Sequence, residues 1–149
     1  MKNQLLLESF EALLQAQPTE ISILSNASAF IFEHIDQLNW VGFYLFNGKK
    51  LILGPFQGKV ACSTIELGKG VCGESALNRK TIVVDDVLSH VNHIACDSHS
   101  RSEVVVPIII KDQLYGVLDV DSPIFRRFDH ELVRFFESFV DILVKSIDK

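Results

Sequence analysis

Hydrophobic residues near the start of the chain recur with the period of an amphipathic helix. Apolar side chains between residues 5 and 14 fall on one helical face, and Pro18 ends the pattern. Thr19 is a suitable N-cap for a second helix, whose apolar positions extend over residues 21–38. The pattern therefore predicts two helices before any strand.

From residue 40 the pattern becomes typical of short strands joined by tight turns. Residues 40–46 predict a first strand, and the Asn47-Gly48 turn predicts a hairpin with residues 51–53. A third strand is expected over residues 59–67. Further strands are predicted over residues 81–84, 103–110 and 114–121, the last two joined by a turn at residues 111–112.

Two more helices complete the predicted elements. The glycine-rich residues 68–73 lead into a short helix over residues 74–78, and Asp129 is a suitable N-cap for a last helix with an apolar stripe. Short strands joined by hairpins, with helices at both chain ends, indicate an α+β fold. We expect a central antiparallel sheet with helices packed on one face.

Length, composition and charge narrow the classes of protein. The 149 residues, 48% of them hydrophobic, suit one buried core, so we expect a single domain over residues 1–149. The net charge of −5 and the absence of a basic stripe argue against nucleic acid as a partner. Glu8 and Glu11 interrupt the first apolar run, and no long uncharged apolar run follows. A cytoplasmic protein without a membrane segment is expected.

The three cysteines need individual explanations, because an odd count favours free thiols with catalytic, redox or metal-binding roles. Cys96 lies in a polar loop that leads into one of the most apolar strands. Cys72 lies at the start of the short helix, where backbone N–H groups and the helix dipole favour a thiolate. Cys62 lies in the predicted third strand.

Two cofactor patterns are present in weak form. The glycines at 68, 70 and 73 match a dinucleotide fingerprint, but the helix that follows is too short for a crossover, so a tight turn is the favoured interpretation. His93, Cys96 and His99 have metal-ligand spacing, with Cys62 and Cys72 as further candidates. The cysteines lack the close pairs of structural zinc sites, so no bound metal or cofactor is expected, and His90 and His99 are interpreted as solvated.

Carboxylates are the more informative group. Asp119 and Asp121 alternate with apolar residues, so both side chains point to one face of a strand. Glu103 begins the neighbouring strand, so three carboxylates converge near the loop of Cys96; the alternative is an exposed, frayed strand end before Pro123. Clustered carboxylates can bind an ammonium group and, with one raised pKa, deliver a proton to a basic oxygen. An amino acid sulfoxide has both groups.

Seven short segments, taken in order, resemble the free methionine-(R)-sulfoxide reductases, enzymes built on a GAF domain. The segments are WVGFY at residues 40–44, LGPFQG at 53–58, AC at 61–62, GKGVCG at 68–73, HIACD at 93–97, SRSE at 100–103 and LDVDSP at 118–123. The resemblance covers nearly the whole chain. It implies an antiparallel sheet of six strands flanked by helices, and commonly a homodimer.

The resemblance also implies roles for the cysteines. Cys96 would attack the sulfur of the sulfoxide, release methionine and become a sulfenic acid. Cys72 would resolve the sulfenic acid as a disulfide, which thioredoxin reduces with NADPH as the ultimate source of electrons. Cys62 matches an auxiliary cysteine of the family, either an alternative disulfide partner or a strand thiol with a packing role.

By the same resemblance, Glu103, Asp119 and Asp121 would hold the ammonium group and the sulfoxide oxygen. Trp40 and Tyr44 would enclose the S-methyl group, although both also suit a core position on the first strand. The sequence departs from the family before Cys96, where His90 and Asn92 replace an aromatic residue and a glycine. Loop closure and substrate affinity are the properties that this difference affects.

Two other functions remain open from the sequence. A GAF domain can serve as a non-enzymatic sensor of a small molecule, because fold alone does not fix function. The cysteines could instead serve a redox or metal sensor that has no substrate. A sensor is normally joined to an output domain and does not require three spaced thiols, so the enzyme is favoured.

Overall fold

The computed structural model describes residues 2–91 and 99–148. It contains, in chain order, α1 (Lys2–Leu14), α2 (Glu20–His34), β1 (Trp40–Phe46), β2 (Lys50–Gly58), β3 (Thr64–Glu66), α3 (Gly70–Asn78), β4 (Ile82–Val84), the short 3₁₀-helix η1 (Val87–Ser89), β5 (Ser102–Ile110), β6 (Gln113–Ser122) and α4 (His130–Ile147). None of the helices in these two segments is long and apolar enough to cross a membrane.

The strands form one six-stranded sheet in the order β3-β2-β1-β6-β5-β4, and every neighbouring pair is antiparallel. Both predicted hairpins are confirmed. The β5–β6 turn places Lys111 and Asp112 at φ values of 51° and 64°, the left-handed region that a tight two-residue hairpin turn requires. The predicted N-caps are also confirmed, since the side chains of Thr19 and Asp129 accept hydrogen bonds from the first turns of α2 and α4.

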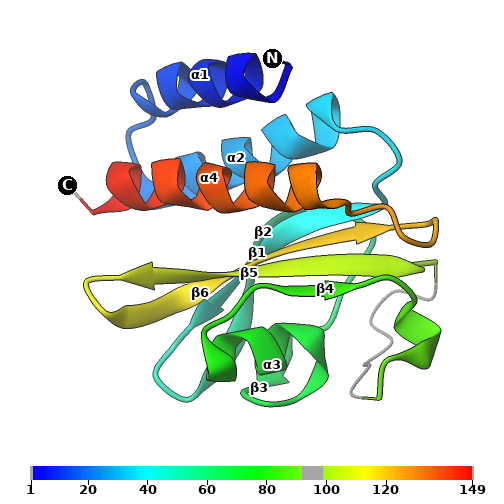
Figure 1. The fold of residues 1–149 in the computed structure, drawn as a ribbon. Coiled ribbons are helices and arrows are strands. Elements are labelled where there is room, and N and C mark those ends of the chain that lie inside the picture. The colour runs from blue at the N-terminus through cyan, green and yellow to red at the C-terminus, as the bar shows by residue number, and fades with distance from the viewer. Residues whose placement is uncertain (1, 92–98, 149) are drawn as a thin grey trace.

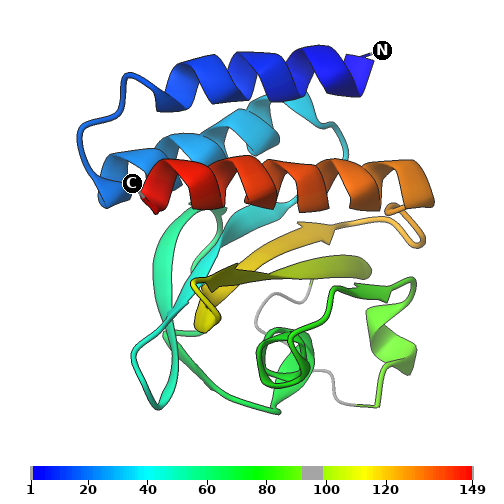
Figure 2. The ribbon, with the colours of Figure 1, turned by 60° about the vertical axis from the view of Figure 1, so that its left-hand side comes forward.

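The helices lie on both faces of the sheet. Helices α2 and α4 pack on one face, and α1 packs on top of them (Figures 1 and 2). Helix α3 lies on the opposite face, against β5 and β6. The expectation that all helices share one face is therefore wrong, because α3 has its own buried side chains, among them Val71, Cys72 and Ala76.

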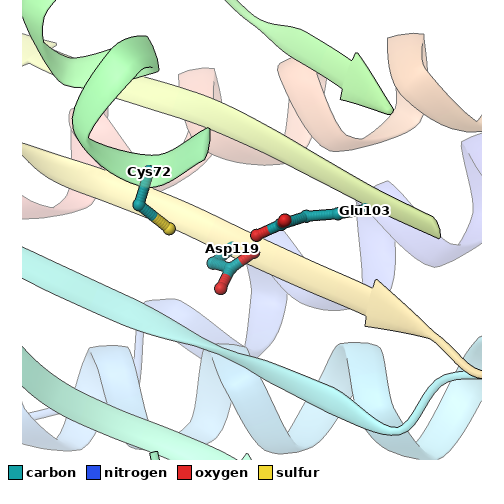
Figure 3. Close-up of side chains that lie close together, drawn as sticks. All are labelled: Cys72, Glu103 and Asp119. Carbon is teal, nitrogen blue, oxygen red and sulfur yellow. The ribbon is translucent and has the colours of Figure 1, made fainter. Parts of the chain in front are cut away.

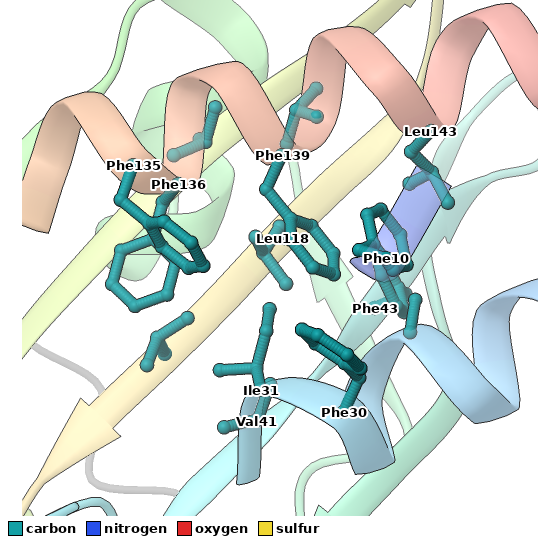
Figure 4. Packing of buried hydrophobic residues seen from close by; sticks show 14 of the residues in the cluster. Phe10, Phe30, Ile31, Val41, Phe43, Leu118, Phe135, Phe136, Phe139 and Leu143 are labelled. Carbon is teal, nitrogen blue, oxygen red and sulfur yellow. The ribbon is translucent and has the colours of Figure 1, made fainter. Parts of the chain in front are cut away.

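Strand alternation divides the buried residues between the two faces. On the side of α2 and α4, Phe10 of α1 stacks on Phe139 of α4 at a ring-centroid distance of 3.6 Å, above Val41 and Phe43 of β1 (Figure 4). On the side of α3, a second cluster contains Trp40, Tyr44, Val105 and Val117. This second face also carries the candidate functional residues.

Two predicted elements differ in extent from the structure. The second arm of the first hairpin continues to Gly58, because β2 pairs with all of β1. The third strand is only Thr64–Glu66 rather than residues 59–67. Gly58, at φ +136°, ends β2, and the carbonyl of the next residue, Lys59, accepts a hydrogen bond from the indole Nε1 of Trp40 at 3.1 Å instead of a strand partner.

Candidate active site

Helix α3 lies close to the sheet because it begins with small residues. A Cβ at Gly73 would lie 2.3 Å from the carbonyl oxygen of Glu66 in β3, so a side chain at this position would force the helix away. The N–H of Gly68 donates to the carbonyl of Gly73 at 2.8 Å and closes the turn before the helix. Packing therefore accounts for Gly73, and a φ of +86° accounts for Gly68 in the turn. Cys72, in the first turn, is only 4% exposed.

The β5–β6 hairpin supplies the carboxylates. Glu103 of β5 lies directly opposite Asp121 of β6, and Asp119 precedes Asp121 by two residues on the same strand. All three side chains therefore point to the face covered by α3. Their exposed fractions are 9% for Glu103, 6% for Asp119 and 8% for Asp121. The predicted convergence is confirmed. The alternative of an exposed strand end is wrong, because these groups are buried and β6 continues to Ser122.

The thiol of Cys72 meets two of these carboxylates. Its Sγ and one carboxylate oxygen each of Glu103 and Asp119 all lie within 4.8 Å of one another, and the three side chains point toward a common centre (Figure 3). The thiol donates a hydrogen bond to Asp119, and the carboxyl groups of Glu103, Asp119 and Asp121 are hydrogen-bonded to one another. The Oδ1 atom of Asp119 is buried and has no hydrogen-bond partner among the described residues.

Burial and mutual repulsion favour the protonated forms of these groups. Burial, followed by the charge of Asp119, raises the pKa of Glu103 well above its usual range. Burial, followed by the charge of Asp121, has the same effect on the pKa of Asp119. Because the pairs share hydrogen bonds, the three carboxyl groups titrate as one coupled cluster that holds at least one proton more readily than isolated acids do.

The expectation of a thiolate at Cys72 is wrong. Burial and, after it, the charges of Asp119, Glu103 and Asp121 raise the pKa of the Cys72 thiol well above its usual value. The helix dipole favours the anion, but its effect is about 0.3–1 kcal/mol at exposed sites and does not offset burial beside acids. Cys72 is therefore a neutral hydrogen-bond donor.

Aromatic residues of β1 form the wall next to the acids. Trp40 and Tyr44, each 2% exposed, stack with a centroid distance of 5.9 Å, and Phe56 of β2 stacks on the other part of the indole at 5.1 Å. Gly42 makes room for this stack, because a Cβ there would lie 2.7 Å from the Trp40 ring. Burial, followed by the charge of Asp119, raises the pKa of the Tyr44 phenol. The phenol is thus neutral and donates to the carbonyl of Cys62 at 2.9 Å.

The cysteines differ in redox state. Cys62 is disulfide-bonded, whereas Cys72 is a free thiol, so Cys62 has a partner other than Cys72. The sequence favoured Cys72 for the disulfide and left Cys62 as an alternative. Cys96, together with His93 and Asn92, lies outside the described residues.

His90 does not match its expected solvated state. Its side chain is 22% exposed, and Nε2 lies 3.3 Å from Oε2 of Glu74 in α3. This contact connects α3 to the end of the described segment before residue 92. His99 is exposed, as expected.

Some features of the site had no clear signal in the sequence. The proximity of Cys72 to Asp119 depends on how α3 packs against the sheet, which local periodicity does not encode. Phe56 lies opposite Gly42 of β1, two residues from Trp40 on the same face, so a predicted second strand that extended to residue 58 would have placed Phe56 beside Trp40. The predicted strand 51–53 ended too early for that inference.

Chemically, the cluster can bind a positive group and hold a proton at the same time. Ionised carboxylate attracts an ammonium group in a buried site, and a protonated carboxyl donates a hydrogen bond to a basic oxygen. Cys72, Glu103 and Asp119 also have the atom types and spacing of ligands for a divalent cation of intermediate softness. The unsatisfied oxygen of Asp119 indicates a position for a ligand of one of these kinds.

Comparison with known proteins supports one of these uses. The GAF domain family matches residues 9–147. The free methionine-R-sulfoxide reductase of Escherichia coli is 44% identical over 122 residues, which cover 82% of this chain and 74% of the relative. The enzyme of the same name from Saccharomyces cerevisiae is 45% identical over 149 residues, covering 95% of this chain and 83% of the relative.

A solved structure supports the same family assignment. A free methionine-R-sulfoxide reductase from Neisseria meningitidis, solved in complex with its substrate, has a TM-score of 0.94 at 37% identity and covers 97% of this chain and 87% of its own. The match extends over both helical layers and the sheet that carries the acids. The chain therefore belongs to the GAF family and, within it, to the free methionine-R-sulfoxide reductases.

Proposed function

We propose that this chain reduces free L-methionine-(R)-sulfoxide to L-methionine. The observation that carries the proposal is the buried cluster of Glu103, Asp119 and Asp121, in which one oxygen of Asp119 has no partner among the described residues. A ligand with an ammonium group and a basic oxygen satisfies such a cluster. The relatives with this fold and 44–45% identity are named for that substrate.

The carboxyl cluster has two tasks in this reaction. Its ionised form attracts the ammonium group of the amino acid, and its retained proton hydrogen-bonds to the sulfoxide oxygen. A hydrogen bond from this proton to the oxygen polarises the S–O bond, so the sulfoxide sulfur becomes more electrophilic and more open to attack by a thiol. The raised pKa values of Glu103 and Asp119 support the second task, because an acid with a usual pKa would be ionised at neutral pH.

The reaction begins with Cys96 as nucleophile, a role that the family resemblance assigns. Its sulfur attacks the sulfoxide sulfur, the oxygen is transferred, methionine is released and Cys96 becomes a sulfenic acid. A second thiol then attacks the sulfenic acid, forms a disulfide and releases water. The sulfoxide is reduced by two electrons and the two thiols are oxidised by two.

We assign Cys62 the resolving role in preference to Cys72. The disulfide of Cys62 supports this order, and so does the buried, protonated state of Cys72, because a thiolate is the attacking form. Tyr44, through its hydrogen bond to the Cys62 carbonyl, anchors the segment that carries this cysteine. Trp40 and Tyr44 also provide the apolar wall for the S-methyl group.

The remaining features of the proposal come from the family resemblance. Thioredoxin reduces the disulfide by thiol exchange, and thioredoxin reductase supplies electrons from NADPH. No tightly bound cofactor or metal is required. A cytoplasmic location, where thioredoxin keeps thiols reduced, and a homodimeric state are further parts of the proposal.

A coupled assay tests the substrate. The purified chain, with thioredoxin, thioredoxin reductase and NADPH, is expected to consume NADPH when free L-methionine-(R)-sulfoxide is added. The S epimer and a peptide that contains methionine sulfoxide are the matched controls and should give only the background rate. Equal rates with both epimers would contradict the proposal, and binding of a small molecule without turnover would favour the sensor function.

A further inference from the structure

Cys72 is a buried thiol that the proposed mechanism does not use. It is a free thiol in the first turn of α3, and its sulfur points at Glu103 and Asp119 instead of at solvent (Figure 3). We propose that Cys72 is a positioning residue, whose thiol donates a hydrogen bond to Asp119, orients that carboxylate within the acid cluster, and stays reduced during turnover. Its effect on turnover rests on the proposed function.

The geometry holds this sulfur in place. Close contact between Gly73 and the carbonyl of Glu66 fixes the start of α3 against β3, and the Gly68–Gly73 hydrogen bond closes the preceding turn. Cys72 is 4% exposed, so its side chain has few alternative positions. A thiol at this point has one proton to donate, and the group that receives it is Asp119.

The same environment makes Cys72 a poor participant in disulfide exchange. Burial and the neighbouring acids favour the neutral thiol, and the neutral thiol is the unreactive form. A resolving thiol attacks as the thiolate, whereas a hydrogen-bond donor acts in the neutral form that this environment favours.

Orientation of Asp119 matters because this residue contacts both Glu103 and Asp121. The hydrogen bond from Cys72 occupies one part of the carboxylate and leaves the buried Oδ1 available. Cys72→Ser keeps a donor of similar size, whereas Cys72→Ala removes it. The two substitutions therefore separate hydrogen bonding from redox chemistry, because neither variant can form a disulfide.

Steady-state kinetics of the full chain give the first test. Cys72→Ala is expected to lose about 10- to 100-fold in kcat/KM for the sulfoxide, the usual effect of one lost hydrogen bond to a charged group. Cys72→Ser should stay within about threefold of the wild type, because its hydroxyl replaces the donor. Equal, large losses in both variants would overturn the proposal and assign Cys72 a redox role, and an Ala variant like the wild type would overturn it too.

A second test needs no substrate. The carboxyl carbon of Asp119, followed by NMR against pH in ¹³C-labelled protein, should titrate at higher pH in Cys72→Ala than in the wild type, because the thiol donates to the carboxylate form. Cys72→Ser should restore the wild-type titration. A purely structural role would leave the serine and alanine titrations alike, which would overturn the inference even if the sulfoxide were not the substrate.

A third test reads the redox state directly. After one turnover with the sulfoxide in the absence of reductant, differential alkylation and mass spectrometry should find Cys72 as a thiol in the wild-type chain. Recovery of Cys72 in a disulfide would overturn the proposal. An inactive wild type with the expected NMR shifts would instead reject the substrate and leave the positioning role in place.

Discussion

Three acids within a few ångströms of one another are costly to bury unless they share protons or bind a cation. In this structure Glu103, Asp119 and Asp121 share protons, through hydrogen bonds between their carboxyl groups. The cost of burying them explains why the site is poised for a ligand, because an ammonium group relieves repulsion that the protein alone leaves in place.

Asp119 is expected to be the most sensitive of the acids to substitution, because it contacts Glu103, Asp121 and Cys72. Asp119→Asn keeps the shape but neither ionises nor donates an acidic proton, so kcat/KM for the sulfoxide should fall by about 10²- to 10⁴-fold, the range of general acid catalysis. Asp141→Asn, on the exposed surface of α4, is the matched control. Rates that remain within a few-fold of each other in the two variants would remove the acid cluster from the mechanism.

The acids also predict how stability depends on pH. The usual pKa values are 4.5 for Glu103 and 3.8 for Asp119, and both are raised in the folded chain. The folded state therefore holds more protons than the unfolded state, so the stability that protonation contributes is fully present below the usual pKa and is lost as pH rises through the folded pKa.

Denaturant unfolding measures this dependence. The free energy of unfolding of the wild type should decline as pH rises from the usual carboxyl range through the raised pKa of the cluster, and Glu103→Gln, which stays neutral, should show a flatter curve. The same titration should lower activity on the alkaline side, since the proton donor is lost. A wild-type stability curve that rises over this range would contradict the buried, proton-sharing cluster.

At the scale of single residues, periodicity predicted which side chains share a face, but not which elements meet. Alternation placed Asp119 and Asp121 together, and the hairpin placed Glu103 beside them. No sequence pattern indicated that Cys72 contacts Asp119, because that contact depends on tertiary packing of α3. The expectation of a thiolate at Cys72 failed for the same reason, because the sequence does not show that this thiol is buried beside acids.

Among the elements, the start of α3 controls the position of Cys72. Gly73→Ala would place a methyl group 2.3 Å from the carbonyl oxygen of Glu66, so α3 must shift. A loss of about 1–3 kcal/mol in the free energy of unfolding is expected, together with reduced activity. Leu77→Ala on the same helix is the control, because Leu77 is 58% exposed and its loss should cost within about 0.5 kcal/mol. Similar stability in the two variants would show that the close contact is unimportant.

Elements with local signals were predicted well, and those that depend on distant partners were not. The N-caps at Thr19 and Asp129 and the turn at residues 111–112 are encoded within a few residues, and the structure confirms them. The ends of β2 and β3 depend on pairing with β1 and on the hydrogen bond from Trp40 to Lys59. Neither partner is visible in the local pattern.

On the scale of the whole molecule, the sheet separates two tasks. The face under α2 and α4 carries a large apolar cluster that holds the fold together, and the face under α3 carries the acids, the aromatic wall and Cys72. The sequence predicted the antiparallel sheet but assigned all helices to one face. It could not assign α3, because a helix of nine residues with buried small side chains has a weak amphipathic pattern.

The homodimer is a prediction about the whole molecule that sedimentation or light scattering can measure. A particle of twice the chain mass of 16.7 kDa is expected at micromolar concentration. A particle of 16.7 kDa across the accessible concentration range would contradict it, and it would leave the acid cluster unaffected, because Glu103, Asp119 and Asp121 all come from one chain.

The most direct measurement of the central claim is a single turnover without a reducing system. The fully reduced wild type, freed of reductant and mixed with free L-methionine-(R)-sulfoxide, should release about one equivalent of methionine per chain, because each chain oxidises one pair of thiols. Cys96→Ser should release none. Release of the same amount of methionine by Cys96→Ser, or none by the wild type, would contradict the account.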